Sequence, residues 1–136
     1  MEVKQFIGLD VGSKRTGIAR ASSVAALAQP LKTVATDQLE KALTELTDDD
    51  VAAIVVGLPR SLQGDDTAQT TWVRQWVTDA KSKINKPFYW QDEALTTVHA
   101  ASQKFSGKNN PGIDALSAAI ILQDFMDTAE TERVLC

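Results

Sequence analysis

The chain is poor in the residues that several kinds of catalysis and anchoring require. Its single cysteine, Cys136, excludes an internal disulfide and a multi-cysteine metal site. His99 is its only histidine and no acyl-transfer nucleophile motif accompanies it, so serine- or cysteine-type catalysis has no support. No apolar run approaches the ~20 residues of a membrane helix, and the first residues show no secretory signal. We therefore expect a cytoplasmic protein in a reducing compartment, without a membrane partner.

The remaining composition is that of an ordinary globular protein. The chain has 136 residues, of which 43% are hydrophobic and 24% are charged. It contains no internal repeat, linker or low-complexity stretch, and its length matches the usual size of one domain. We expect a single domain over residues 1–136.

The charge is unevenly distributed along the chain. The formal net charge of −4 argues at first against a nucleic-acid partner, because phosphate binding favours a basic surface. However, residues 37–50 and 124–136 together hold ten of the 18 acids and only two of the 14 bases. The rest of the chain has 8 acids and 12 bases, a local charge of +4. A polyanionic partner therefore remains compatible with the sequence.

Hydrophobic periodicity predicts a hairpin followed by alternating strands and helices. Residues 51–56 are six consecutive apolar residues, a pattern typical of a strand covered on both faces. Asp37, with Glu40 three residues later, predicts a capped helix start. The expected strands cover residues 3–9, 16–21, 31–34, 51–56 and 87–91, and the expected helices cover 37–46, 65–84, 95–105 and 113–128.

This order predicts an α/β fold with a mixed five-stranded sheet. The first, fourth and fifth strands are expected to be parallel, because helical crossovers join them. Ligands of open α/β sheets bind at the carboxyl ends of such strands. The residues expected at that edge are Asp10, the turn 57–59 and the pair Asp92-Glu93.

Three carboxylates are candidates for a functional site, and each also has a structural explanation. Asp10 ends a strand and could bond turn amides, and Glu93 could be an acid that favours a helix start. Asp114 lies in the first turn of an otherwise apolar or small-residue helix, where it could be an N-cap. On that surface an unpaired carboxylate is costly, so we expect a backbone amide, a base or a metal ion as its partner.

Together, these acids would concentrate negative charge at one sheet edge, which requires a cation. Ligation by oxygen alone suits Mg²⁺ or Mn²⁺. Two such ions, ~3.5–4 Å apart, can stabilise the attacking and leaving oxygens of a phosphodiester displacement. The sequence therefore predicts a site that hydrolyses the backbone of a nucleic acid.

Basic and aromatic residues near this edge have two interpretations each. Lys14 and Arg15, in the first turn, and Arg60, after the turn at 57–59, could bind phosphate or be solvated surface residues. Trp72 and Trp76 could stack on bases, but their spacing of four residues favours core packing.

Four motifs resemble those of the YqgF/RuvX family, in the family's order and over nearly the whole chain. They are Gly8-Leu-Asp-Val-Gly-Ser-Lys-Arg-Thr-Gly-Ile-Ala19, Val55-Val-Gly-Leu-Pro59 with Gly64, Asp92-Glu-Ala-Leu-Thr-Thr97, and Asp114-Ala-Leu-Ser-Ala-Ala-Ile-Ile-Leu-Gln123. The segment Ala28-Gln-Pro-Leu31 fits the same pattern. One departure is Ala94, where the family usually has arginine.

The resemblance implies an RNase H-like fold, with helices on both faces of the sheet, and a nuclease that matures the 5′ end of pre-16S rRNA, with pre-ribosomal particles as partners. The family is also described as a Holliday junction resolvase acting on branched DNA. The family's acidic triad falls on Asp10, Glu93 and Asp114.

Two alternatives belong to other classes. Residues 10–19 also resemble the phosphate-binding hairpin of actin-like ATPases, but 136 residues cannot supply the two large lobes of that fold. A ribosome-assembly factor that binds RNA without cleaving it is the other alternative.

Overall fold

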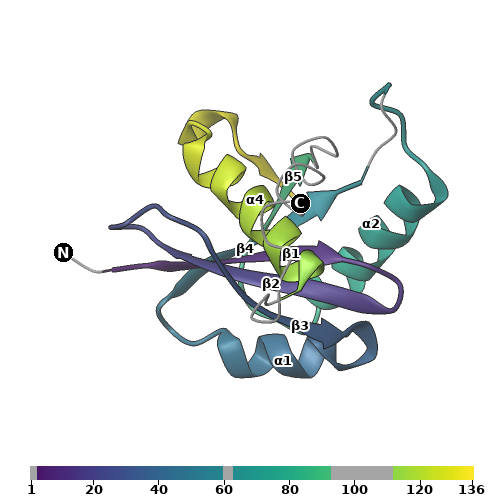
Figure 1. Ribbon diagram of the computed structural model, residues 1–136, viewed down its shortest axis with the longest axis horizontal. Helices are drawn as coiled ribbons and strands as arrows, with labels where there is room; N and C mark the ends of the chain where they lie inside the picture. Colours follow the sequence, from purple (N-terminus) through teal and green to yellow (C-terminus); the bar gives the residue numbers. More distant parts are fainter. Residues whose placement is uncertain (1–2, 60–62, 93–111) are drawn as a thin grey trace.

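The described residues form a six-stranded mixed sheet with helices on both faces (Figure 1). The structure is a computed structural model, and it describes residues 3–59, 63–92 and 112–136. The strands are β1 (Gln5–Val11), β2 (Arg15–Ser22), β3 (Gln29–Ala35), β4 (Val51–Leu58), β5 (Phe88–Asp92) and β6 (Val134–Leu135). The helices are α1 (Leu39–Leu46), α2 (Ala68–Lys81) and α4 (Ile113–Asp127), with short 3-10 turns at Thr36–Gln38 and Glu130–Glu132. The helix expected over residues 95–105 lies outside the described residues.

The strand order β3-β2-β1-β4-β5-β6 places the three parallel strands side by side. β1 pairs with β4 and β4 pairs with β5, both in parallel, which confirms the prediction for these strands. β2 is antiparallel to β1 and to β3, as a hairpin start requires. The carboxyl ends of β1, β4 and β5 therefore meet at one edge of the sheet.

The prediction of five strands was wrong, because the described residues form a sixth strand, β6, near the C-terminus. This strand pairs antiparallel with β5, where Trp90 lies opposite Val134, and the Cys136 N–H donates to the Phe88 carbonyl at 2.8 Å. Val134 and Leu135 are both exposed, and two residues are too few to show periodicity. Burial raises the pKa of the Cys136 thiol to about 12, although Lys81 and Arg74 nearby oppose the rise.

Alternation along β1 assigns its side chains to the two faces of the sheet. Ile7, Leu9 and Val11 belong to a core cluster that includes buried residues of α1 and α2. Phe6 packs against a second cluster, which contains the buried residues of α4. Asp10 lies four residues after Phe6 and therefore shares the α4 face. In the part of the chain described here, no helix is long and apolar enough to cross a bilayer.

The helix α2 buries a different face from the one that the sequence predicted. The spacing of Trp72 and Trp76 favoured core packing, but Trp72 is 40% exposed. The buried stripe runs through Thr70, Val73, Val77 and Ala80, and Trp76 is partly buried beside it. The valines are shifted by one position from the tryptophans and fit the spacing of one helical face equally well.

The predicted helix start at Asp37 was also wrong. The chain makes a 3-10 turn over Thr36–Gln38, so α1 begins at Leu39 and has no side-chain cap. A capping box exists instead at the start of α2, where the side chains of Thr67 and Thr70 bond each other's backbone N–H groups.

Candidate active site

Asp10 is positioned by the pairing of β1 with β2. It is the penultimate residue of β1, the strand between β2 and β4, and its register partner on β2 is Gly17. In an antiparallel pair, directly opposite Cα atoms lie about 4.5–5.5 Å apart and their substituents project to the same face. The half-buried Asp10 side chain therefore lies on the α4 face, at the carboxyl edge of the sheet.

Asp114 reaches the same place because α4 approaches the sheet very closely. Figure 1 shows α4 lying across β1 and β2, the strands with which it makes most of its contacts. A Cβ atom at Gly17 would overlap the carbonyl oxygen of Asp114, so only glycine allows this approach. Since Gly17 is also the register partner of Asp10, the two acids share one corner of the α4 face.

Arg15 forms an ion pair with Asp114. The Arg15 Nε lies 3.3 Å from the Asp114 Oδ2, and the two side chains are 71% and 27% exposed. The sequence predicted an amide, a base or a metal ion as the partner of this carboxylate, and the described structure supplies the base. The N-cap explanation for Asp114 was wrong, because the N-cap of α4 is Gly112 and no side chain caps the helix.

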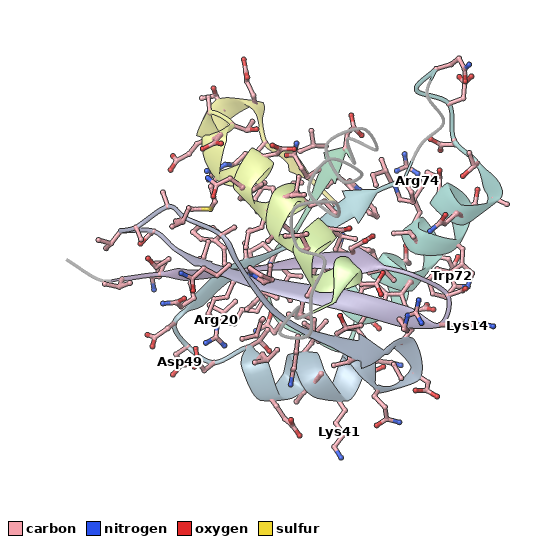
Figure 2. The ribbon with its side chains drawn as sticks, viewed as in Figure 1. Lys14, Arg20, Lys41, Asp49, Trp72 and Arg74 are labelled. Carbon is pink, nitrogen blue, oxygen red and sulfur yellow. The ribbon has the colours of Figure 1, made fainter. Side chains whose placement is uncertain are left out.

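A hollow of about 440 Å³ lies beside this ion pair. Its lining residues come from the β1–β2 turn, from the start of α2 and from the start of α4, and they are Gly12, Ser13, Lys14, Arg15, Gln69 and Asp114. Figure 2 shows Lys14 at the tip of the hairpin. The hollow therefore brings two of the three predicted phosphate-binding residues next to a predicted catalytic acid.

Gln69 in this hollow was missed by the sequence interpretation. It is the second residue of an exposed first helical turn, and no motif distinguishes it there. Only the packing of α2 beside the hairpin reveals it.

The other predicted site residues are only partly described. Glu93, Arg60, Ala94 and His99 lie outside the described residues. Asp92, which precedes Glu93, is exposed at the end of β5, at the same edge as Asp10. Within the described ranges, no three or more acids, histidines or cysteines gather closely enough to hold a metal ion. Asp10 and Asp114 are two of the three predicted ligands, so the assignment of all three stays a prediction.

Comparisons with known proteins support a single family. The profile of the family described as RuvX, Holliday junction resolvase, matches residues 4–128. A relative from Roseiflexus sp. (strain RS-1) is 38% identical over an alignment of 136 positions, which covers 93% of this chain and 96% of the relative. A relative from Chloroflexus aggregans is 33% identical over 137 aligned positions, with the same coverage. Both are named "Putative pre-16S rRNA nuclease".

Solved structures with a similar fold include RuvC of Thermus thermophilus. Its complex with a Holliday junction substrate aligns with a TM-score of 0.59 and 13% identity, covering 98% of this chain and 99% of RuvC. A second structure of this RuvC also gives a TM-score of 0.59, with 14% identity. The likeness confirms the RNase H-like fold implied by the sequence motifs. With the profile covering most of its length, the chain belongs to the RuvX (YqgF) family.

Proposed function

We propose that this chain is a nuclease that hydrolyses a phosphodiester bond in a structured precursor of 16S rRNA. The observation that carries the proposal is that Asp10 and Asp114 both lie next to Gly17, and that Asp114 lines a hollow together with Lys14 and Arg15. Hydrolysis of a phosphodiester uses both kinds of side chain, because basic residues bind the phosphate while acidic residues position the reacting groups. The names of the relatives support the same activity and substrate.

The carboxylates fit a divalent cation. Asp10 and Asp114 supply hard oxygen donors at the edge of a rigid sheet, the donor type that Mg²⁺ and Mn²⁺ prefer. We propose Glu93 as the third ligand and a pair of ions as the cofactor. When bound, such a pair supplies the positive charge that stabilises the attacking and leaving oxygens of the displacement.

The residues of this chain then have separate tasks. Asp10, paired with Gly17 on β2, and Asp114, held by the contact of α4 with Gly17, fix the positions of the ligand oxygens. Lys14 and Arg15, with Arg60, bind and orient the phosphate. In the hydrolysis itself, a water oxygen forms a bond to phosphorus while the bond to the leaving oxygen breaks.

The alternative is cleavage of branched DNA, as a Holliday junction resolvase. The description of the family and the fold of RuvC favour this candidate. The chemistry at Asp10 and Asp114 would be the same, so the two candidates differ in the substrate that the surface accepts. In either role we propose one domain over residues 1–136, acting in the cytoplasm, with pre-ribosomal particles as the partner for the RNA substrate.

The test is a comparison of substrates under one set of conditions. Purified protein is incubated with precursor 16S rRNA, a four-way DNA junction or ATP, each with Mn²⁺ or with excess chelator. We expect cleavage of the RNA at a discrete site, only with Mn²⁺. Cleavage of the junction alone would favour the alternative, whereas RNA binding without cleavage would identify an assembly factor. Activity in excess chelator would contradict a metal-dependent mechanism.

A further inference from the structure

A second hollow lies at the carboxyl end of β5 and shares no lining residue with the first. It has a volume of about 380 Å³, within the range of about 300–1,000 Å³ that is usual for ligand pockets. Its walls come from the ends of β4 and β5, from α2 and from the C-terminal segment, and they are Leu58, Arg74, Trp90, Gln91, Asp92, Thr128, Glu132, Arg133 and Val134. We call it the β5 cleft.

One wall of the β5 cleft combines the guanidinium of Arg74 with the ring of Trp90. The guanidinium carbon of Arg74 lies 5.5 Å from the ring centroid of Trp90. Asp66 forms an ion pair with Arg74, with its Oδ2 at 3.3 Å from the Arg74 Nε, and the Arg74 side chain is 40% exposed. Arg74 is therefore positioned rather than freely moving, and part of its surface is open to a ligand. Nucleobases stack on aromatic rings and on guanidinium planes.

The polar groups of the cleft suit a base better than a phosphate. Asp92 and Glu132 place carboxylates in the lining, and these repel a phosphate but accept hydrogen bonds from the N–H groups of a base edge.

The cleft is close to the proposed site of cleavage. β5 is two strands from β1, so the two strands lie roughly 10 Å apart. Figure 2 shows Lys14 and Arg74 toward the same end of the sheet, away from Arg20 and Asp49. A nucleic-acid strand held at Lys14 and Arg15 can therefore extend along this edge to the β5 cleft.

From these observations we propose that the β5 cleft binds one unpaired nucleobase of an RNA strand, flanking the phosphodiester that is cleaved. The proposal rests on the proposed nuclease function for the identity of the strand. A base engaged in a duplex cannot enter a cleft of this kind, so the cleft selects substrates with a single-stranded nucleotide beside the cleavage point. Trp90 and Arg74 are the stacking platform, and Glu132 contacts the edge of the base.

Tryptophan fluorescence tests the stacking directly. The experiment titrates the full chain, in chelator so that no cleavage occurs, with a short single-stranded oligoribonucleotide or with the same strand annealed to its complement. We expect the single strand to quench the fluorescence more strongly than the duplex. Trp90→Phe should abolish the quenching, while Trp72→Phe, which changes an exposed tryptophan on α2, should retain it. Quenching that persists in Trp90→Phe, or disappears in Trp72→Phe, would overturn the proposal.

A second variant tests the β5 cleft independently, in case the Trp90→Phe substitution changes the fold. Arg74→Gln should weaken binding of the single strand by at least about fivefold, the lower end of the effect of one lost stack. Arg20→Gln is the matched control, since it removes the same charge from an exposed arginine on β2. Equal affinities of Arg74→Gln and Arg20→Gln would reject the cleft as a base-binding site.

These experiments distinguish a failure of the proposed nuclease function from a failure of the proposed base-binding site. If cleavage with Mn²⁺ is absent but Trp90-dependent quenching is present, the nuclease assignment is wrong and the base site remains. If cleavage is present but Trp90→Phe and Arg74→Gln bind and cleave as the parent does, the base site is wrong and the nuclease assignment remains.

Discussion

The ion pair of Arg15 and Asp114 sets the charge of the candidate site before a cation binds. Asp114 is mostly buried and Arg15 is mostly exposed, so the arginine can leave without exposing a core. The same guanidinium lines the hollow in which we expect the phosphate. We therefore expect Arg15 to compete with a divalent cation for Asp114 and to become available to the phosphate when that cation is bound.

At the residue scale, we predict that Arg15→Gln tightens the binding of Mn²⁺ by about 1.4- to fivefold. An exposed ion pair contributes on the order of 0.2–1 kcal/mol of stability. In Arg15→Gln the incoming cation no longer has to break this ion pair. Calorimetric titration of the metal into RNA-free protein measures the change. Lys14→Gln, which removes a neighbouring charge that has no ion pair among the described residues, should have a smaller effect. Weaker Mn²⁺ binding in Arg15→Gln would show that Arg15 does not compete for Asp114.

Among the elements, β4 was predictable because its run of six apolar residues is typical of a buried parallel strand, and β1 and β5 were predicted beside it. The positions of Asp10 and Asp92 at the carboxyl edge followed from the ends of those strands. The pairing of Arg15 with Asp114 was not predictable, because it depends on the register of β2 and on the depth at which α4 packs. The β5 cleft could not be predicted from the sequence either, because β6 contributes to one of its walls and this strand has only two residues, both exposed.

The packing of α4 on two glycines leads to a prediction for this element. Gly17→Ala should destabilise the fold by about 1–3 kcal/mol, because the new methyl group must displace the first turn of α4. Gly8→Ala is the matched control: its Cβ would lie 2.7 Å from the Leu122 Cβ, further along the same helix. Both variants should melt below the parent in chelator, as followed by circular dichroism.

The two glycine variants should differ once metal is added. Gly17→Ala moves Asp114 and should lose most of the stabilisation that Mn²⁺ gives the parent, whereas Gly8→Ala should keep it. An equal Mn²⁺ shift in both variants would mean that the contact of Gly17 with α4 does not position a metal ligand.

Over the whole molecule, one group of acidic residues lies away from the candidate site. Asp48, Asp49 and Asp50 precede β4 and so lie at the opposite edge of the sheet from Lys14, as Figure 2 shows for Asp49. The net charge of −4 therefore does not describe the surface around Lys14, although Asp92 and Glu132 place two carboxylates in the β5 cleft.

The central claim is that Asp10 and Asp114 form a metal-dependent site that cleaves RNA, and single-turnover cleavage tests it most directly. The assay follows end-labelled precursor 16S rRNA with excess enzyme and Mn²⁺, comparing the parent with Asp10→Asn, Asp114→Asn and the control Asp124→Asn. Asp124 lies on the same helix as Asp114 but outside the hollow, and burial together with Asp127 raises its pKa. We predict a loss of at least about 100-fold for Asp10→Asn and for Asp114→Asn, the size expected when a group that stabilises the transition state is removed. Asp124→Asn should cleave at the parental rate. Cleavage near the parental rate by either of the first two variants would contradict the claim.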